Sequence, residues 1–171
     1  MRAFIGIPLL GPRDLPALLN RLKLNDMLRV EKAGNLHVTV LFFAELPEGK
    51  VERVGRAIEG IGIGRFRIRY GRISGFPDPG RSRVIILEIH SPELLDISHA
   101  ILSGLNIIPD RKFVPHLTLA RAKHPIAIKD LGIDAGMFDG MEEGAEKIVL
   151  FQSILGRTGA VHRPIREHQL M

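Results

Sequence analysis

The sequence "NLHVTV" at residues 35–40 returns almost unchanged as "VPHLTL" at residues 114–119, and each copy places a Thr two positions after a His. The chain has only three Thr and seven His residues, so chance is a poor explanation for two such pairs. Side chains at positions i and i+2 of a strand lie on the same face. We therefore expect His37 with Thr39, and His116 with Thr118, to project from two matched strands.

The segments that lead into the two copies also match. "FIGI" at residues 4–7 is followed by a helical pattern and then "HVTV", and "VIIL" at residues 84–87 is followed by a helical pattern and then "HLTL". The two offsets are 80 and 79 residues. Two copies of a strand, helix, strand unit predict two pseudo-twofold lobes that bring the His-x-Thr strands face to face.

The apolar periodicity places further elements around this repeat. Helices are expected after Asp14 as N-cap, over Gly49–Ile61 and over Pro92–Leu105. Strands are expected over Arg2–Pro8, Leu36–Ala44, 65–73, Val84–Ile89, Phe113–Ala120, Lys147–Leu155 and Ala160–Gln169. We expect one two-lobed domain over residues 1–171. Its lobe joint is placed at the turn-rich "GFPDPG" of residues 75–80, and its C-terminal strands can pair back across the lobes.

The composition narrows the classes of function. With 45% apolar and 25% charged residues the chain is an ordinary globular protein, and its net charge of +5 favours an anionic partner such as a nucleic acid. The absence of Cys excludes a thiolate nucleophile and a Cys-ligated zinc. No apolar run approaches the roughly 18 residues that span a bilayer, and no secretory signal is evident. We expect a cytoplasmic protein without a membrane partner, and a monomer as the simplest state.

Two His and two Thr around one cleft suit phosphoryl transfer without a metal or other cofactor. Imidazole titrates near pH 6.5, so one ring can accept a proton while the other donates one. A Thr hydroxyl can donate to a phosphate oxygen. Arg121 can add a bidentate clamp, but strict alternation puts it on the face opposite His116, so a bulge or strand end must turn it inward. The remaining His residues show no metal-binding spacing. His162 can edge the cleft by its place in the closing segment, although we rather expect a solvated strand residue there.

The paired motif resembles the signature of the 2H phosphoesterase superfamily. "MRAFIGI", "NLHVTVLFFAE", "GFP" and "FVPHLTLAR" together are similar to its branch of RNA 2′,3′-cyclic phosphodiesterases, also called 2′-5′ RNA ligases. The resemblance runs over nearly the whole chain. It implies an α+β fold of two pseudo-symmetric lobes, each an antiparallel sheet with helices packed outside, around a central cleft.

The same resemblance implies roles for individual residues. His37 would be the general acid at the leaving 3′-oxygen and His116 the base for the attacking water, with a 2′-phosphate as product. Thr39, Thr118 and Arg121 would hold the phosphate of an RNA that carries a 2′,3′-cyclic phosphate end, and Phe42 would stack on its base. The chain lacks two features common in the family, an aromatic residue shortly before the first motif and a Tyr near the C-terminus.

Substrate and activity leave alternatives open. Arg65, Arg67 and Arg69 alternate with apolar residues and can track an RNA backbone, although a solvated strand face explains them equally well. Reverse, ATP-independent joining of RNA ends is implied by the resemblance. The alternatives are a cyclic phosphodiesterase acting on a small nucleotide or ADP-ribose derivative, and an RNA-binding module that does no chemistry.

Overall fold

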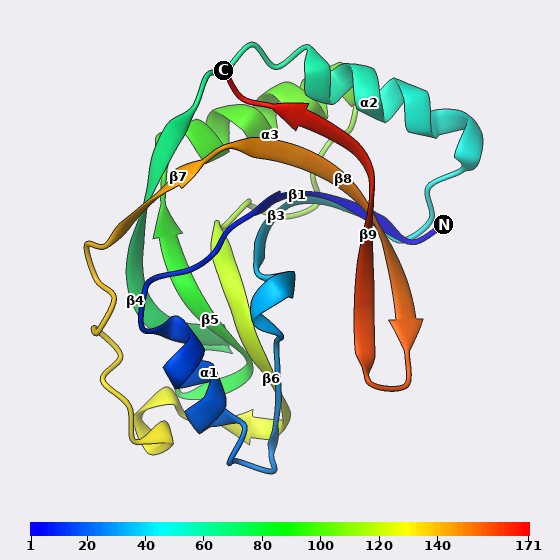
Figure 1. Ribbon diagram of the computed structural model, residues 1–171. Helices are drawn as coiled ribbons and strands as arrows, with labels where there is room; N and C mark the ends of the chain where they lie inside the picture. The colour runs from blue at the N-terminus through cyan, green and yellow to red at the C-terminus, as the bar shows by residue number, and fades with distance from the viewer.

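The computed structural model describes residues 1–171 as a curled antiparallel sheet with three α-helices (Figure 1). The helices are α1 (Leu15–Leu22), α2 (Val51–Glu59) and α3 (Pro92–Leu105). The strands are β1 (Ala3–Pro8), β2 (Leu28–Val30), β3 (His37–Phe43), β4 (Phe66–Asp78), β5 (Arg81–His90), β6 (His116–Ile126), β7 (Glu142–Ala145), β8 (Lys147–Gly156) and β9 (Gly159–Gln169). Their order in the sheet is β7-β4-β5-β6-β3-β1-β8-β9, and β2 pairs with β6.

The strand order has a pseudo-twofold centre between β3 and β6. On one side lie β3, β1, β8 and β9, which we call the His37 half; on the other lie β6, β5, β4 and β7, which we call the His116 half. A single residue pair, Val38 with Leu117, joins the two halves. The fold is therefore the expected α+β architecture of two similar antiparallel sheets, here fused through their central strands into one curled sheet.

One face of this sheet and the apolar faces of all three helices share a single core. On β1 the alternate residues Ala3, Ile5 and Ile7 enter that core, whereas Phe4 is buried on the other face. Helices α2 and α3 contact each other and lie side by side along one side of the sheet (Figure 1). None of the helices is both long and apolar enough to cross a membrane. The opposite, concave face of the sheet is left for the side chains that alternate with the core residues.

Most predicted elements are confirmed. Helix α3 spans the predicted residues Pro92–Leu105, with Ser91 as N-cap and Asn106 in the left-handed conformation after its end. The helix predicted over Gly49–Ile61 is shorter, because a 3₁₀ turn precedes α2. The C-terminal strand β8 pairs with β1, so the chain returns to the half in which it began.

The predicted lobe joint at residues 75–80 is wrong. Residues 75–78 end β4, and the next two residues form the turn into β5, so this stretch connects two paired strands within the His116 half. Asp78 accepts hydrogen bonds from the backbone amides of Gly80 and Arg81 and closes the turn. Gly and Pro mark a change of chain direction, and a hairpin satisfies that signal as well as a boundary between lobes. The chain crosses between the halves at α2 and again between β7 and β8.

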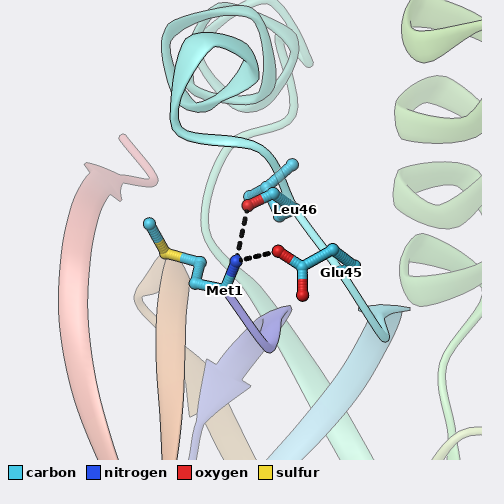
Figure 2. Close-up of polar contacts among 3 residues, drawn as sticks. All are labelled: Met1, Glu45 and Leu46. Carbon is cyan, nitrogen blue, oxygen red and sulfur yellow. Dashed lines mark hydrogen bonds and ion pairs between the residues drawn. The ribbon is translucent and has the colours of Figure 1, made fainter.

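The start of the chain is fixed to the segment that follows β3. The amino group of Met1 donates to the Glu45 carboxylate at 2.6 Å and to the Leu46 carbonyl at 2.9 Å (Figure 2). These contacts hold the start of β1 beside the end of β3. Arg2 and Phe42 lie next to this anchor, and the Arg2 guanidinium is 4.8 Å from the centre of the Phe42 ring.

Candidate active site

The two His-x-Thr motifs lie on the adjacent central strands, as their repetition predicts. His37 and Thr39 on β3, and His116 and Thr118 on β6, are partly exposed, whereas the residues between them are buried. The Val38–Leu117 pair fixes the register. One step to either side, His37 comes opposite Thr118, and Thr39 comes opposite His116. The four polar side chains therefore share one face across the centre of the sheet.

Both imidazoles are fixed through the same ring nitrogen. His37 Nδ1 lies 2.6 Å from the Asn35 carbonyl oxygen, and His116 Nδ1 lies 2.7 Å from the Val114 carbonyl oxygen. A carbonyl oxygen only accepts hydrogen bonds, so each Nδ1 carries the hydrogen and donates it. In the neutral ring this leaves Nε2 with a lone pair. Each histidine therefore presents Nε2 as a pre-oriented proton acceptor, because its Nδ1 is bound to the carbonyl of the residue two positions earlier.

The threonine of the first motif lies close to its own histidine. The Thr39 hydroxyl is 3.1 Å from His37 Nε2 and can donate to it while the ring is neutral. If the ring is protonated, Nε2 becomes the donor and the hydroxyl accepts. Thr39 can thus follow either protonation state of His37 without moving.

A bulge follows each motif and turns the next polar or aromatic residue onto the motif's face. On β6, Thr118 and Ala120 pair with consecutive residues of β5, so Leu119 is the extra residue. On β3, Thr39 and Leu41 pair with consecutive residues of β1, so Val40 is extra. The predicted bulge before Arg121 is therefore present, and the matching bulge on β3 does the same for the residue five positions after His37.

His37 is packed among aromatic rings. The Phe4 ring stacks on it at a centroid distance of 4.5 Å and an angle of 25°, and the His162 ring stands nearly perpendicular at 5.2 Å. The Phe151 ring in turn stacks on Phe4, at a centroid distance of 5.0 Å. The pKa of His37 is lowered to about 4, chiefly by burial and to a smaller extent by the nearby His162 and His116, against the opposing effect of the Asn35 hydrogen bond. His37 is neutral in the free protein at pH 7.

His116 has a less aromatic and more cationic setting. Phe76 packs edge-on against it at 4.9 Å. Burial lowers the pKa of His116, and the positive charge of Arg121 lowers it too, while the Val114 hydrogen bond raises it. Phe76 belongs to the "GFP" segment that formed part of the family resemblance, and its position on β4 gives that segment a role beside the second histidine.

His162 lies against His37, which agrees with a place at the edge of the cleft and not with a solvated strand residue. It lies on β9 and is T-shaped against both Phe4 and His37. Its Nδ1 is buried without a hydrogen-bond partner, and burial lowers its pKa. Together with His37 and His116 it does not form a group that could hold a metal ion. Only the pairing of Ser153 with His162 across the β8–β9 hairpin brings it here, and no local sequence pattern signals that pairing.

The remaining predicted residues differ in position. Phe42 is 46% exposed next to Arg2, which leaves ring surface free beside the site. Arg67 and Arg69 lie on β4 and Arg65 directly precedes it, and β5 separates this strand from the histidine strands. Arg67 and Arg69 both pair with Glu142 of β7, at 3.1 and 3.8 Å, and Arg65 donates to the Leu170 carbonyl. The arginine row is thus exposed but engaged within the protein.

Comparison with known proteins identifies relatives along the whole chain. The model of the LigT-like phosphoesterase family matches residues 7–86. A Methanocaldococcus jannaschii protein named RNA 2′,3′-cyclic phosphodiesterase is 30% identical over 180 residues, which cover 98% of this chain and 99% of that protein. A protein of the same name from Aeropyrum pernix is 31% identical over 143 residues, which cover 78% of this chain and 81% of that protein.

Solved structures share the fold at lower identity. A Thermus thermophilus protein superimposes with a TM-score of 0.82 at 23% identity, covering 99% of this chain and 98% of that one. Escherichia coli LigT in complex with 3′-AMP superimposes with a TM-score of 0.78 at 22% identity, covering 99% and 97%. The curled sheet described above is therefore a known architecture, present in full in both proteins.

Proposed function

The chain belongs to the LigT-like phosphoesterase family, and we propose that it hydrolyses 2′,3′-cyclic phosphates at RNA ends to 2′-phosphates. One observation carries the proposal: His37 and His116 project from matched strands, each with Nδ1 bound to a backbone carbonyl, which leaves Nε2 as the nitrogen that can exchange a proton on the shared face. The names of the relatives, RNA 2′,3′-cyclic phosphodiesterase, support the substrate class.

The proposed reaction uses one imidazole on each side of the phosphorus. His116 Nε2 removes a proton from water as the water oxygen bonds to phosphorus. The bond from phosphorus to the 3′-oxygen breaks, and that oxygen takes a proton from His37 Nε2. A properly placed acid or base typically contributes about 10² to 10⁴ in rate. The products are a 2′-phosphate and a free 3′-hydroxyl, and the two histidines exchange protonation states.

Because the pKa of His37 is low, His37 needs the negative charge of the bound substrate to become protonated and act as an acid. With its pKa at about 4, free His37 holds almost no proton at pH 7. A unit negative charge about 4 Å away contributes roughly 4 kcal/mol at an effective dielectric constant near 20, or about 3 pKa units. A bound phosphate can therefore raise the pKa of His37 to near neutrality. We propose that the acid form arises only when the anionic substrate is in place.

The other residues of the site would hold the substrate. Thr39 and Thr118 can each donate a hydroxyl hydrogen to a non-bridging oxygen, and Arg121 can clamp developing negative charge with two parallel hydrogen bonds. Phe42 offers an exposed ring on which the terminal base can stack. The phosphate would then lie between the two motifs, and the base would extend towards the His37 half.

The same groups can join two RNA ends when a 5′-hydroxyl takes the place of water. His116 then removes the proton of the 5′-hydroxyl as its oxygen bonds to phosphorus, and the 3′-oxygen again leaves with the proton from His37. A 2′-5′ phosphodiester forms without ATP, because the cyclic phosphate supplies the reactive bond. Water access and RNA concentration would set the balance between hydrolysis and joining.

A second candidate is hydrolysis of a small cyclic nucleotide or an ADP-ribose derivative. The observation that favours it is the engagement of Arg67 and Arg69 by Glu142, because a short substrate needs no long cationic track. The acid and base chemistry would be the same, and only the binding of the rest of the substrate would differ.

The experiment that tests the proposal is a product assay. The protein is incubated in EDTA with a short RNA that bears a 2′,3′-cyclic phosphate, and the 2′-phosphate and 3′-phosphate products are separated by chromatography. The expected result is conversion to the 2′-phosphate alone at an unchanged rate in EDTA. Absence of conversion would contradict the enzymatic function, and sensitivity to EDTA would contradict the metal-free mechanism.

A further inference from the structure

A second row of cations begins at the site itself. On β6, Lys123 follows Arg121 by two residues, so both side chains lie on the face of His116 and Thr118 beyond the bulge. On the short strand β2, Arg29 pairs directly with Arg121 across the sheet. Directly paired residues of antiparallel strands project to the same side. Arg29, Arg121 and Lys123 are all exposed and share that side.

These three cations have no ion-pair partner. The six ion pairs of the structure involve other residues, and none includes Arg29, Arg121 or Lys123. One carboxylate, Glu31, lies two residues after Arg29. Burial raises the pKa of Glu31, whereas the charges of Arg121 and Arg29 lower it. One partly buried carboxylate is therefore shared by two of the three cations, and the group keeps a positive charge.

This arrangement is the reverse of that on β4. There, two arginines share the carboxylate of Glu142, and Arg65 is bonded to a backbone carbonyl. On β2 and β6, two arginines stand directly opposite each other, and neither forms an ion pair, although Glu31 lies near both. Like charges in directly opposite positions destabilise a sheet. An anionic ligand between them removes that repulsion. The cations that the structure leaves free for an anion therefore lie beside His116, away from the β4 row.

We propose that Arg29 and Lys123 bind backbone phosphodiesters of an RNA outside the reacting cyclic phosphate, with Arg121 at the junction between this track and the site. The inference rests on the proposed function and narrows its substrate to a nucleic acid chain rather than a single nucleotide. Arginine and lysine contacts to phosphates supply most sequence-independent affinity for nucleic acids. Such a track can hold either the strand that bears the cyclic end or a second strand that offers a 5′-hydroxyl.

The test compares two double variants that each remove two positive charges. Arg29→Gln with Lys123→Gln alters the proposed track, and Arg67→Gln with Arg69→Gln is the matched control on β4. Hydrolysis is measured on a cyclic mononucleotide and on an RNA of about six nucleotides with a 2′,3′-cyclic end. We expect the track variant to lower kcat/KM on the oligonucleotide by about tenfold or more and to reduce its salt slope by roughly 1.4, the value for two phosphate contacts to a single strand.

The control variant should stay within about threefold of the parent on both substrates, and the track variant within about threefold on the mononucleotide. If the track variant loses activity only when a second RNA with a 5′-hydroxyl is joined, the track would be assigned to that second strand. Equal losses in the two double variants, equal losses on the two substrates, or no loss in any assay would overturn the track. In that case, turnover of the mononucleotide by the parent protein would still support the proposed phosphodiesterase function. If the parent turns over neither substrate, both the proposed function and the track are contradicted.

Discussion

The two halves of the sheet share a backbone design but surround their histidines differently. Each His donates Nδ1–H to the carbonyl two residues before it, and each motif ends in a bulge after its Thr. Around His37 the neighbours are Phe4, Phe151 and His162, whereas His116 has one aromatic neighbour and the cation of Arg121.

This difference shows how a duplicated unit can acquire two roles. The shared contacts fix two Nε2 atoms in equivalent positions, so the repeat supplies the geometry. In the proposed mechanism the neighbours then set the chemistry, because the buried aromatic group keeps His37 neutral and the cation of Arg121 attracts phosphate. We expect each half to depend on its own neighbours.

The largest effect is expected from removing either imidazole. His37→Ala and His116→Ala should each lower kcat by about 10² or more, because each removes one proton transfer that the other cannot replace. Neither side chain belongs to the hydrophobic core, so the fold should persist. The measurement is single-substrate kinetics on a cyclic-ended RNA, with circular dichroism as the control. Turnover within about threefold of the parent in either variant would refute the role of that histidine.

Arg121 should matter next, and mainly through the transition state. Arg121→Ala removes the cation that follows His116 and should lower kcat/KM by about 10², a typical loss for one donor to developing charge. Arg121→Lys should recover only part of this loss, because lysine cannot make the bidentate contact. Steady-state kinetics on a cyclic mononucleotide is the suitable assay, since it isolates the phosphate from the track. Full recovery by lysine would argue against a clamp.

Phe42, at the matching position of the His37 half, should act on binding. Phe42→Ala should raise KM by about tenfold with little change in kcat, because stacking on a base contributes roughly 1 to 3 kcal/mol. Phe42→Trp preserves a ring and should remain near the parent. A loss of kcat as large as that of the Arg121→Ala variant would show that the two halves do not divide phosphate and base between them.

A further effect, on stability and not on activity, is expected in acid. The pKa of His37 is about 4 in the folded protein and near 6.5 when unfolded, so the unfolded chain binds more protons between these values. Stability should fall as pH decreases from about 6.5 to about 4, by at most about 3 kcal/mol from this residue. His37→Gln should flatten the pH dependence of the urea midpoint, and His99→Gln on the exposed side of α3 should not. An unchanged slope in His37→Gln would contradict the burial of a neutral His37.

The sequence predicted those features that depend on local pattern. Helix α3 could be predicted to the residue because Pro92 begins it, and its apolar residues recur at helical spacing. The repeat of His37 and Thr39 in His116 and Thr118 predicted a shared face. Even the bulge before Arg121 could be anticipated, because strict alternation would have placed that arginine on the wrong side.

The rest depends on pairing between distant segments. The strands β2 and β7 have three and four residues, too few to show alternation, and so the pairing of Arg29 with Arg121 had no signal. His162 reaches His37 only through the β8–β9 hairpin. The engagement of the β4 arginines by Glu142, about 75 residues further along the chain, was hidden for the same reason.

The most direct test is a titration of the two imidazoles by nuclear magnetic resonance, with and without saturating inorganic phosphate. His37→Ala and His116→Ala spectra assign the ring signals. We expect His37 to titrate near pH 4 in the free protein, and phosphate to raise its pKa by about 2 to 3 units, the magnitude expected for an adjacent anion. If free His37 titrates near pH 6.5, or if phosphate does not change its pKa, the claim that His37 becomes protonated only with bound substrate is contradicted.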